Sequence, residues 1–250
     1  MGETVLILAH PGHELLLHHW MERTRPRVYL LTDGSGGAKS SRVHFSAACV
    51  ERAGATAGGV FGEASDKSWY RALADRDAAP FADVAERIVR DLATRASLVV
   101  CDPVEGFNPM HDMAAAVAAY VCARTGSQLA TYPLVHRAGD EPAIETLTLG
   151  SEALQRKREA IAAYTELAGE TDSFAVHDQA SWAVEHLFAA PPLLEWFDQL
   201  PEHPDYERIG AERVASGRYQ SALTSAGHVR PVVEALLGLV AHRAPDRAAS

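Results

Sequence analysis

The sequence has few cysteines, and their arrangement does not indicate a disulfide framework. The three cysteines, Cys49, Cys101 and Cys122, are far apart and form no C-x-x-C pair. Small secreted proteins instead use closely spaced cysteines in even numbers. Because each cysteine has apolar neighbours, we expect buried, reduced thiols, as in a cytoplasmic protein.

The chain also lacks the segments that would direct it to a membrane or through one. No apolar run approaches the ~20 residues that a transmembrane helix needs. Glu3 and Thr4 precede the first apolar run without a basic segment, a pattern that is not typical of a signal peptide. We therefore expect a soluble cytoplasmic protein with no membrane partner.

The sequence has fewer basic than acidic residues. The 250 residues include 23 Lys and Arg against 33 Asp and Glu, which gives a formal net charge of -10. Nucleic acids and anionic membranes attract positive surfaces, so neither is expected as a partner. This balance does not restrict a small-molecule substrate, and it leaves a homo-oligomer open.

Nucleotide-binding motifs are missing as well. The glycine-rich stretch DGSGG (33–37) is followed by no G-K-[ST], and no G-x-G-x-x-G follows the first apolar run. We therefore interpret this stretch as a flexible rim of a pocket.

What the sequence does contain is an alternation of strand-like and helix-like segments. Near-continuous apolar strands separated by helices predict an α/β fold that is Rossmann-like, with a mostly parallel sheet covered by helices on both faces. We expect one domain over 1–250, with an α/β core at about 1–135 and a helical or irregular C-terminal elaboration at about 136–250. Residues 169–210 are interpreted as an ordered but irregular excursion. The expected strands are 4–9, 27–32, 97–102 and 129–133, and the expected helices are 14–23, 41–54, 80–95, 111–125, 152–167 and 229–242.

Three of the expected strands end in polar residues that can do chemistry, at Ala9-His10, Thr32-Asp33 and Cys101-Asp102. Parallel α/β sheets bind ligands outside the carboxyl ends of their strands. After the first strand, His10 and His13 lie in an H-P-G-H turn, in which both imidazoles can point toward one position. Imidazole is the commonest metal ligand in proteins. Ordinary hydrogen-bonded histidines are the alternative, and the spacing alone favours them.

A further group of polar residues follows the strand at 97–102. There a loop rich in Gly, Asn and Pro leads into a helix, which brings Asn108, His111 and Asp112 to the same edge of the predicted sheet. A catalytic zinc site takes three protein ligands and leaves one position open. The second loop therefore raises the metal interpretation above the alternative.

These motifs resemble the PIG-L / LmbE-like family of zinc-dependent N-deacetylases, which act mostly on N-acetylglucosamine-type substrates. The family's A-H-P-D-D-E is similar to Ala9–Glu14, and its T-D/N-G-E-x-G is similar to Thr32–Gly36. Arg42 matches an arginine that opens the next helix, and Asn108–His111 matches the family's H-P-D-H. The resemblance covers about residues 4 to 125.

The resemblance implies a site with zinc bound by His10, His13 and His111, or with another divalent metal such as Fe²⁺. His13 stands where the family has an aspartate ligand. Gly12 replaces the family's general base, and Asn108 replaces the histidine that assists the oxyanion or the leaving amine. The expected metal ligands are thus present, while both residues that handle protons are changed.

Several residues are candidates for the general base and for the group that stabilises the oxyanion. We expect Glu105 as the base, with Asp112 and Glu14 as alternatives, and Asn108 as the donor to an oxyanion. The residues expected to contact a substrate are Arg42, Asp33, Asp66 and His228. The expected function is a metal-dependent N-deacetylase of an N-acyl amino sugar or related metabolite, in which metal-bound water attacks the acyl carbonyl. The alternative is a non-catalytic sugar-binding protein of the same fold that has lost the base.

Overall fold

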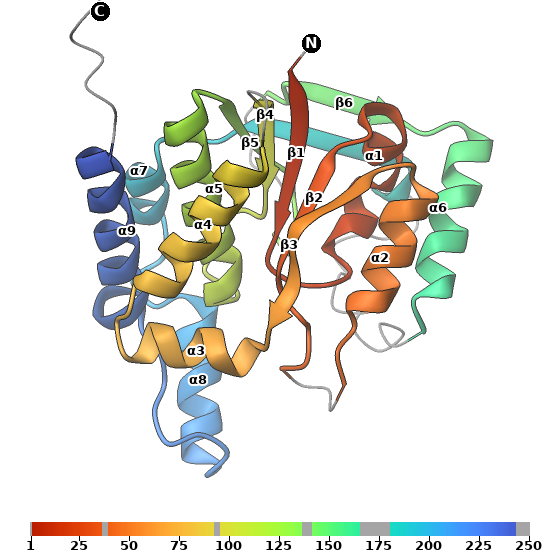
Figure 1. Ribbon diagram of the computed structural model, residues 1–250. Helices are drawn as coiled ribbons and strands as arrows, with labels where there is room; N and C mark the ends of the chain where they lie inside the picture. Colours follow the sequence, from red (N-terminus) through yellow and green to blue (C-terminus); the bar gives the residue numbers. More distant parts are fainter. Residues whose placement is uncertain (1, 37–39, 93–95, 137–141, 166–180, 244–250) are drawn as a thin grey trace, which may run out of the picture.

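The computed structural model describes residues 2–36, 40–92, 96–136, 142–165 and 181–243. Its centre is a seven-stranded sheet in the order β3-β2-β1-β4-β5-β7-β6, which runs through the middle of the molecule (Figure 1). The first five strands in this order pair in parallel, and the last two pairings are antiparallel. The strands are β1 (Glu3–Leu8), β2 (Arg27–Thr32), β3 (Thr56–Ala64), β4 (Ala96–Cys101), β5 (Gln128–Thr131), β6 (Glu145–Thr148) and β7 (Val184–Ala189).

The central strands are apolar on both faces because helices cover both faces of the sheet. Ile7 of β1 pairs with Tyr29 of β2 on one side and with Cys101 of β4 on the other, and all three side chains are fully buried. Two separate apolar clusters lie on the opposite faces. This is the burial expected of a parallel sheet in an α/β fold.

One face of the sheet is covered by α3 (Asp66–Ala74), α4 (Ala79–Asp91), α5 (Pro109–Thr125), α7 (Leu193–Asp198) and α9 (Arg230–Arg243). The other face is covered by the short 3-10 helix η1 (His13–Leu17) and by α1 (His18–Thr24), α2 (Val43–Arg52) and α6 (Ser151–Ala163). The remaining short elements are α8 (Asp205–Ala215), the 3-10 turn η3 (Ser181–Ala183) and the π-turn η4 (Ser225–Val229).

The strand order creates a crevice between β1 and β4. From β1 the chain proceeds outward to β2 and β3, whereas β4 and β5 extend the sheet in the opposite direction. The connections that leave β1 and β4 therefore diverge at their carboxyl ends. Such a switch point is where open α/β sheets bind ligands.

The predicted fold class is confirmed, and the predicted elements are found with shifts of a few residues at their described ends, except that the helix expected over 14–23 is divided into η1 and α1. The cysteines are free thiols, as expected, with Cys49 and Cys101 buried and Cys122 partly buried. No helix among the described residues is long and apolar enough to cross a membrane. The cytoplasmic location stays a prediction.

The prediction that 169–210 is irregular is wrong for its described part, 181–210. This part contains η3, β7, α7 and the start of α8. β7 is a six-residue strand in which buried Glu185 and Leu187 alternate with less buried residues, and β6 is a short edge strand beside it. Strands this short, in which charged residues take interior positions, give a weak periodic signal. Residues 166–180 and the tail 244–250 lie outside the described residues.

β3 is not among the strands expected from the sequence, because glycines interrupt it. Gly58 has no room for a Cβ, which would lie 2.2 Å from the Tyr29 ring of the neighbouring strand. Gly62 has a φ of +67° and lies where the register with β2 shifts. Glycines inside a strand mark close approach and bulges, and they weaken the strand pattern of the sequence.

A buried ion pair joins the C-terminal elements to the segment after β1. Lys157 of α6 donates to the Glu185 carboxylate of β7 at 2.8 Å and to the carbonyl of Leu16 at 2.8 Å. Glu185 also accepts the backbone N–H groups of His19 and Trp20, which are orphan donors in the first turn of α1. Burial lowers the pKa of Lys157, although Glu185 opposes that shift.

We predict that Lys157→Met destabilises the protein by about 3–5 kcal/mol, because it leaves the Glu185 carboxylate buried without its counter-charge. Urea unfolding followed by circular dichroism measures this change. The matched control is Arg208→Met, which removes an exposed ion pair with Asp205 and should leave the free energy of unfolding nearly unchanged. Equal losses in the two variants would contradict the prediction.

Candidate metal centre

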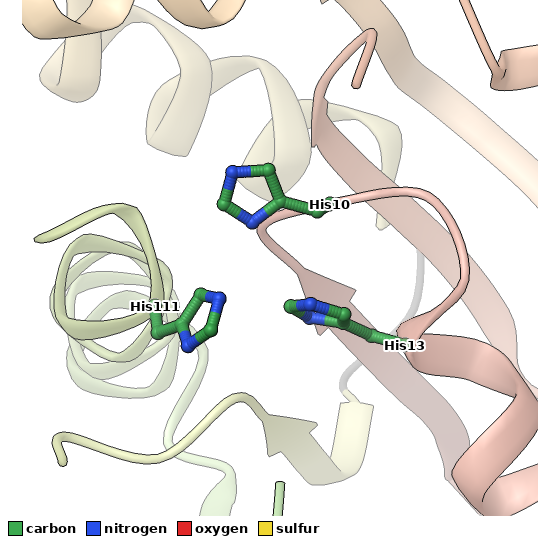
Figure 2. A group of neighbouring side chains, drawn as sticks. All are labelled: His10, His13 and His111. Carbon is green, nitrogen blue, oxygen red and sulfur yellow. The ribbon is translucent and has the colours of Figure 1, made fainter. Parts of the chain in front are cut away.

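Three imidazoles meet at the crevice between β1 and β4. His10 and His13 come from the turn after β1, and His111 comes from the first turn of α5 (Figure 2). The ring centroids are 5.4, 5.2 and 4.8 Å apart, and one nitrogen from each ring lies within 4.8 Å of the others. All three side chains are largely buried, with 4% to 9% of each residue exposed.

His13 is held by a fully buried carboxylate. Asp102, the residue after β4, lies with Oδ2 at 2.8 Å from His13 Nδ1. The same oxygen accepts the backbone N–H of Ala9 at 2.7 Å, and the Tyr132 hydroxyl donates to Oδ1 at 2.6 Å. Burial alone raises the pKa of Asp102, but the imidazole and these donors outweigh it and hold the pKa at about 2. Burial lowers the pKa of His13, and Asp102 reverses the shift so that the pKa lies above its ordinary value.

His111 is held by Glu105 in the loop before α5. Glu105 Oε1 lies 3.2 Å from His111 Nδ1, and Oε2 accepts the backbone N–H groups of Val135 and His136. Burial lowers the pKa of His111 to about 4, although Glu105 opposes the shift. His111 is therefore neutral near pH 7, which is the form of imidazole that binds a metal ion.

His10 faces a third carboxylate. Its Nε2 lies 3.0 Å from Oδ1 of Asp66, the first residue of α3, and Asp66 Oδ2 accepts the backbone N–H of Gly36. The sequence predicted Asp66 only as a substrate contact; Ser65 is the N-cap residue of α3, which begins at Asp66. Burial raises the pKa of Asp66, but the contacts with His10 and Gly36 outweigh it and lower the pKa overall.

Each imidazole thus has one nitrogen turned toward a carboxylate and the other turned toward the two neighbouring rings (Figure 2). Metal-binding histidines commonly donate their outer N–H to a carboxylate, which fixes the tautomer and the orientation of the ring. Three nitrogens that converge in this way fit the ligand set of a catalytic zinc site, in which a fourth position stays open. The arrangement is suited to a divalent metal ion.

The H-P-G-H turn has a conformation that depends on glycine. Gly12 has a φ of 104°, a region that L-residues rarely adopt, and its N–H donates to Glu14 Oε2 at 2.8 Å. Glu14 is 1% exposed and lies in η1. Burial raises its pKa. The contact with Gly12 indicates that Glu14 stabilises the turn.

Asp112 serves the second loop in a similar way. It lies in the first turn of α5, and its Oδ1 accepts the backbone N–H groups of Glu105 and Gly106. Burial raises the pKa of Asp112 to about 8. These contacts hold the backbone of the loop that carries Glu105, and the predicted roles of Asp112 and Glu14 as alternative bases stay predictions.

Asn108 is the N-cap residue of α5. Its Oδ1 accepts the backbone N–H of Met110 at 2.9 Å and the hydroxyl of Tyr70 at 3.0 Å. Because the oxygen receives both donors, the amide group is oriented and its NH₂ can donate elsewhere. Tyr70 lies one helical turn after Asp66, so α3 contacts His10 through Asp66 and Asn108 through Tyr70.

Arg42 and Asp33 shape the rim beside the first histidine turn. Arg42 is buried at the N-terminus of α2 and donates from Nε to the carbonyl of Gly34. A Cβ on Gly34 would lie 2.9 Å from Pro11, so the rim packs directly against the H-P-G-H turn. Asp33 accepts the N–H and hydroxyl of Ser35. The described rim therefore has an internal hydrogen-bond network, and substrate contacts of Arg42 and Asp33 stay predictions.

His228 lies in the π-turn η4, where Nδ1 accepts hydrogen bonds from the backbone N–H and the hydroxyl of Thr224. Through these hydrogen bonds His228 caps the turn. A contact of His228 with substrate stays a prediction.

From the sequence, Asp102 was named only as a polar residue at the end of a strand, and Tyr132 and Tyr70 were given no role. The position of Asp102 could have indicated a buried partner, because a carboxylate directly after a buried strand is costly unless it is paired. Nothing in the sequence indicated the contacts of Tyr132 and Tyr70, because these depend on how β5 and α3 pack.

We predict that Asp102→Asn weakens metal binding about 10–100-fold, because the His13 ring loses the carboxylate that orients it. Titration of the metal-free protein with Zn²⁺ measures the affinity. Asp91→Asn is a matched control, since Asp91 also accepts from a tyrosine hydroxyl and a backbone N–H but lies away from the histidines. An unchanged affinity in Asp102→Asn would rule out this positioning role.

No protein-family model matches the chain, and no curated protein matches it either. Solved structures do match. The A40926 pseudoaglycone deacetylase Dbv21 is 16% identical, with a TM-score of 0.55 over 76% of this chain and 98% of that one. The zinc-inhibited form of teicoplanin deacetylase Orf2 is 13% identical, with a TM-score of 0.54 over 75% and 98%. A deacetylase–teicoplanin complex is 12% identical, with a TM-score of 0.56 over 76% and 100%. The chain therefore shares the α/β fold of these deacetylases.

Proposed function

We propose that the chain is a metal-dependent amide hydrolase of the PIG-L / LmbE-like family, which removes the acyl group from an N-acyl amino sugar or related metabolite. The observation that carries this proposal is the convergence of three imidazoles, each paired with a carboxylate, at the switch point of the sheet. The names of the similar structures support deacetylation as the reaction class.

His10, His13 and His111 would hold the metal, with Zn²⁺ as the first candidate and Fe²⁺ as an alternative. A divalent ion bound there would supply Lewis acidity toward the acyl carbonyl and would lower the pKa of a bound water. The protein side of the reaction then needs a group that takes a proton and a donor that stabilises the developing oxyanion.

Asp66 is our candidate for the proton acceptor. Its Oδ1 contacts the His10 imidazole, and its Oδ2 contacts Gly36 of the exposed rim, so the carboxylate lies between the histidines and the rim. Glu105, the base favoured from the sequence, has both oxygens in hydrogen bonds, with His111 and with two backbone N–H groups, whereas Asp66 Oδ1 is buried and makes no hydrogen bond with the described residues. Glu105 is better suited to positioning His111.

Asn108 is the candidate donor to the oxyanion. Tyr70 and Met110 both donate to its Oδ1, which leaves the side-chain NH₂ to donate to the carbonyl oxygen of a substrate. Amide groups fill this role in other acyl-transfer sites. Arg42 would keep the rim in place through Gly34, and Asp33 and His228 are the remaining candidates for contacts with a substrate hydroxyl.

The metal site is tested by elemental analysis combined with an amine-release assay. Purified protein should contain about one metal per chain, and a chelator should abolish the release of amine from N-acetyl-D-glucosamine and related N-acyl amino sugars. His10→Ala and His111→Ala should each lose the metal, whereas His203→Ala, which changes an exposed histidine, should retain it. Undiminished metal in both site variants would refute the site. Sugar binding without any release of amine would favour the non-catalytic alternative.

The two carboxylates are separated by a second pair of variants. We predict that Asp66→Asn lowers kcat by about 10²–10⁴-fold even at saturating metal, because the proton acceptor is lost. Glu105→Gln should instead weaken metal binding by about 10–100-fold, and excess metal should restore its turnover. If Glu105→Gln stays inactive at saturating metal while Asp66→Asn turns over normally, the base is Glu105.

A further inference from the structure

A cavity of about 300 Å³ lies beside the proposed metal site, and the roles assigned above do not use it. It opens where β4, β5 and β7 come together with the residues around α7, at the edge of the sheet that also carries the histidines. Its walls include Glu105, Tyr132, Pro133, Phe188, Trp196 and Leu200.

Most of the residues that line the cavity have apolar side chains, and polar atoms lie between them. Three aromatic rings and four prolines contribute to its surface, and Tyr132 and Trp196 are themselves largely buried. Its volume is at the lower end of the range for small-molecule sites, and one water accounts for ~30 Å³ of liquid. It therefore fits a group of roughly ten non-hydrogen atoms.

The polar groups at the cavity are already engaged or face solvent. Glu105 accepts from the backbone of Val135 and His136, and Thr131 donates its hydroxyl to the carbonyl of Cys101. The His136 side chain is 52% exposed, and its Nε2 lies 3.7 Å from Asp205. Because carboxylates occupy both the wall and the rim, an anionic ligand is disfavoured. An uncharged apolar group is the occupant that matches these walls.

Glu105 connects the cavity to the histidine cluster. One of its oxygens contacts His111, while the other binds the backbone of the segment that forms the cavity wall. A single side chain therefore separates the two sites. A molecule whose amide carbonyl lies at the histidines can place a neighbouring substituent in the cavity.

We propose that this cavity binds an uncharged alkyl or aryl substituent of the substrate, so that the protein prefers amino sugars that carry a compact apolar group over bare ones. The proposal rests on the proposed function for the identity of the sugar. The group can be the acyl chain on nitrogen or the aglycone on the anomeric carbon. Both have the same chemistry, and the experiment separates them.

The test measures binding by ligand-observed NMR on the full-length protein with four probes. The aglycone arm compares 4-nitrophenyl β-D-glucopyranoside with methyl β-D-glucopyranoside, neither of which contains an amide. The acyl arm compares N-octanoyl-D-glucosamine with N-acetyl-D-glucosamine. In the arm that uses the cavity, we expect the apolar probe to bind about tenfold tighter or more, as burial of an apolar group predicts.

Ala189→Phe tests the location of the binding. Ala189 lines the cavity from an exposed position at the end of β7, so a larger side chain can fill the space without entering the core. The advantage of the apolar probe should fall to less than threefold in this variant. The control Ala57→Phe places the same side chain at an exposed position of β3, at the opposite edge of the sheet, and should preserve the advantage.

Two results would overturn the proposal. One is that neither apolar probe binds more tightly than its partner, and the other is that Ala189→Phe leaves the advantage unchanged. Failure of the proposed function is distinguishable, because the glucoside arm requires no hydrolysis. A protein that releases no amine but binds the aryl glucoside through the cavity would retain this inference and lose the other.

Discussion

The structure of the site depends on one buried carboxylate. Asp102 is 0% exposed, and it binds the Ala9 N–H, the His13 imidazole and the Tyr132 hydroxyl. These partners come from the end of β1, the turn that follows it and the segment after β5, so one side chain joins three connections at the edge of the sheet. A carboxylate is costly to bury unless donors surround it, and here the donors are the parts of the chain that must be aligned. The orientation of His13 follows from this arrangement.

The same pairing is repeated at His10 with Asp66 and at His111 with Glu105. Three carboxylates from different connections offset the positive charge that a divalent ion held by three neutral imidazoles would bring into a buried space. A histidine ligand such as His13 adds no negative charge of its own, so the compensating charge comes from Asp102, which contacts the outer nitrogen of its ring.

Much of the fold and the histidine cluster could be predicted from the sequence. The buried parallel strands β1, β2 and β4 have apolar runs that no other element explains, and the polar residues that end them converge at one edge by topology. β3 and β7 were harder, because glycines or inward charges such as Glu185 break the pattern. The functions of the carboxylates were harder still. As carboxylates, Glu105 and Asp66 could each act as a base or as a substrate contact. Only their distances from His111 and His10 show which imidazole each carboxylate contacts.

The C-terminal elements explain why the site could not be completed from the first half of the chain. Glu185 of β7 caps α1, directly after the first histidine turn, and Lys157 ties the same region to α6. At the second loop, the Tyr206 N–H donates to the carbonyl of Gly106, and a Cβ on Gly106 would lie 2.9 Å from Pro204. Each connection that carries a histidine is therefore in contact with residues more than 90 positions later in the sequence. Such contacts favour the prediction of a single domain, because separating the two halves would expose both supports. β7 has both functions, since its Glu185 caps α1 while its Phe188 and Ala189 line the cavity that would select the substituent of the substrate.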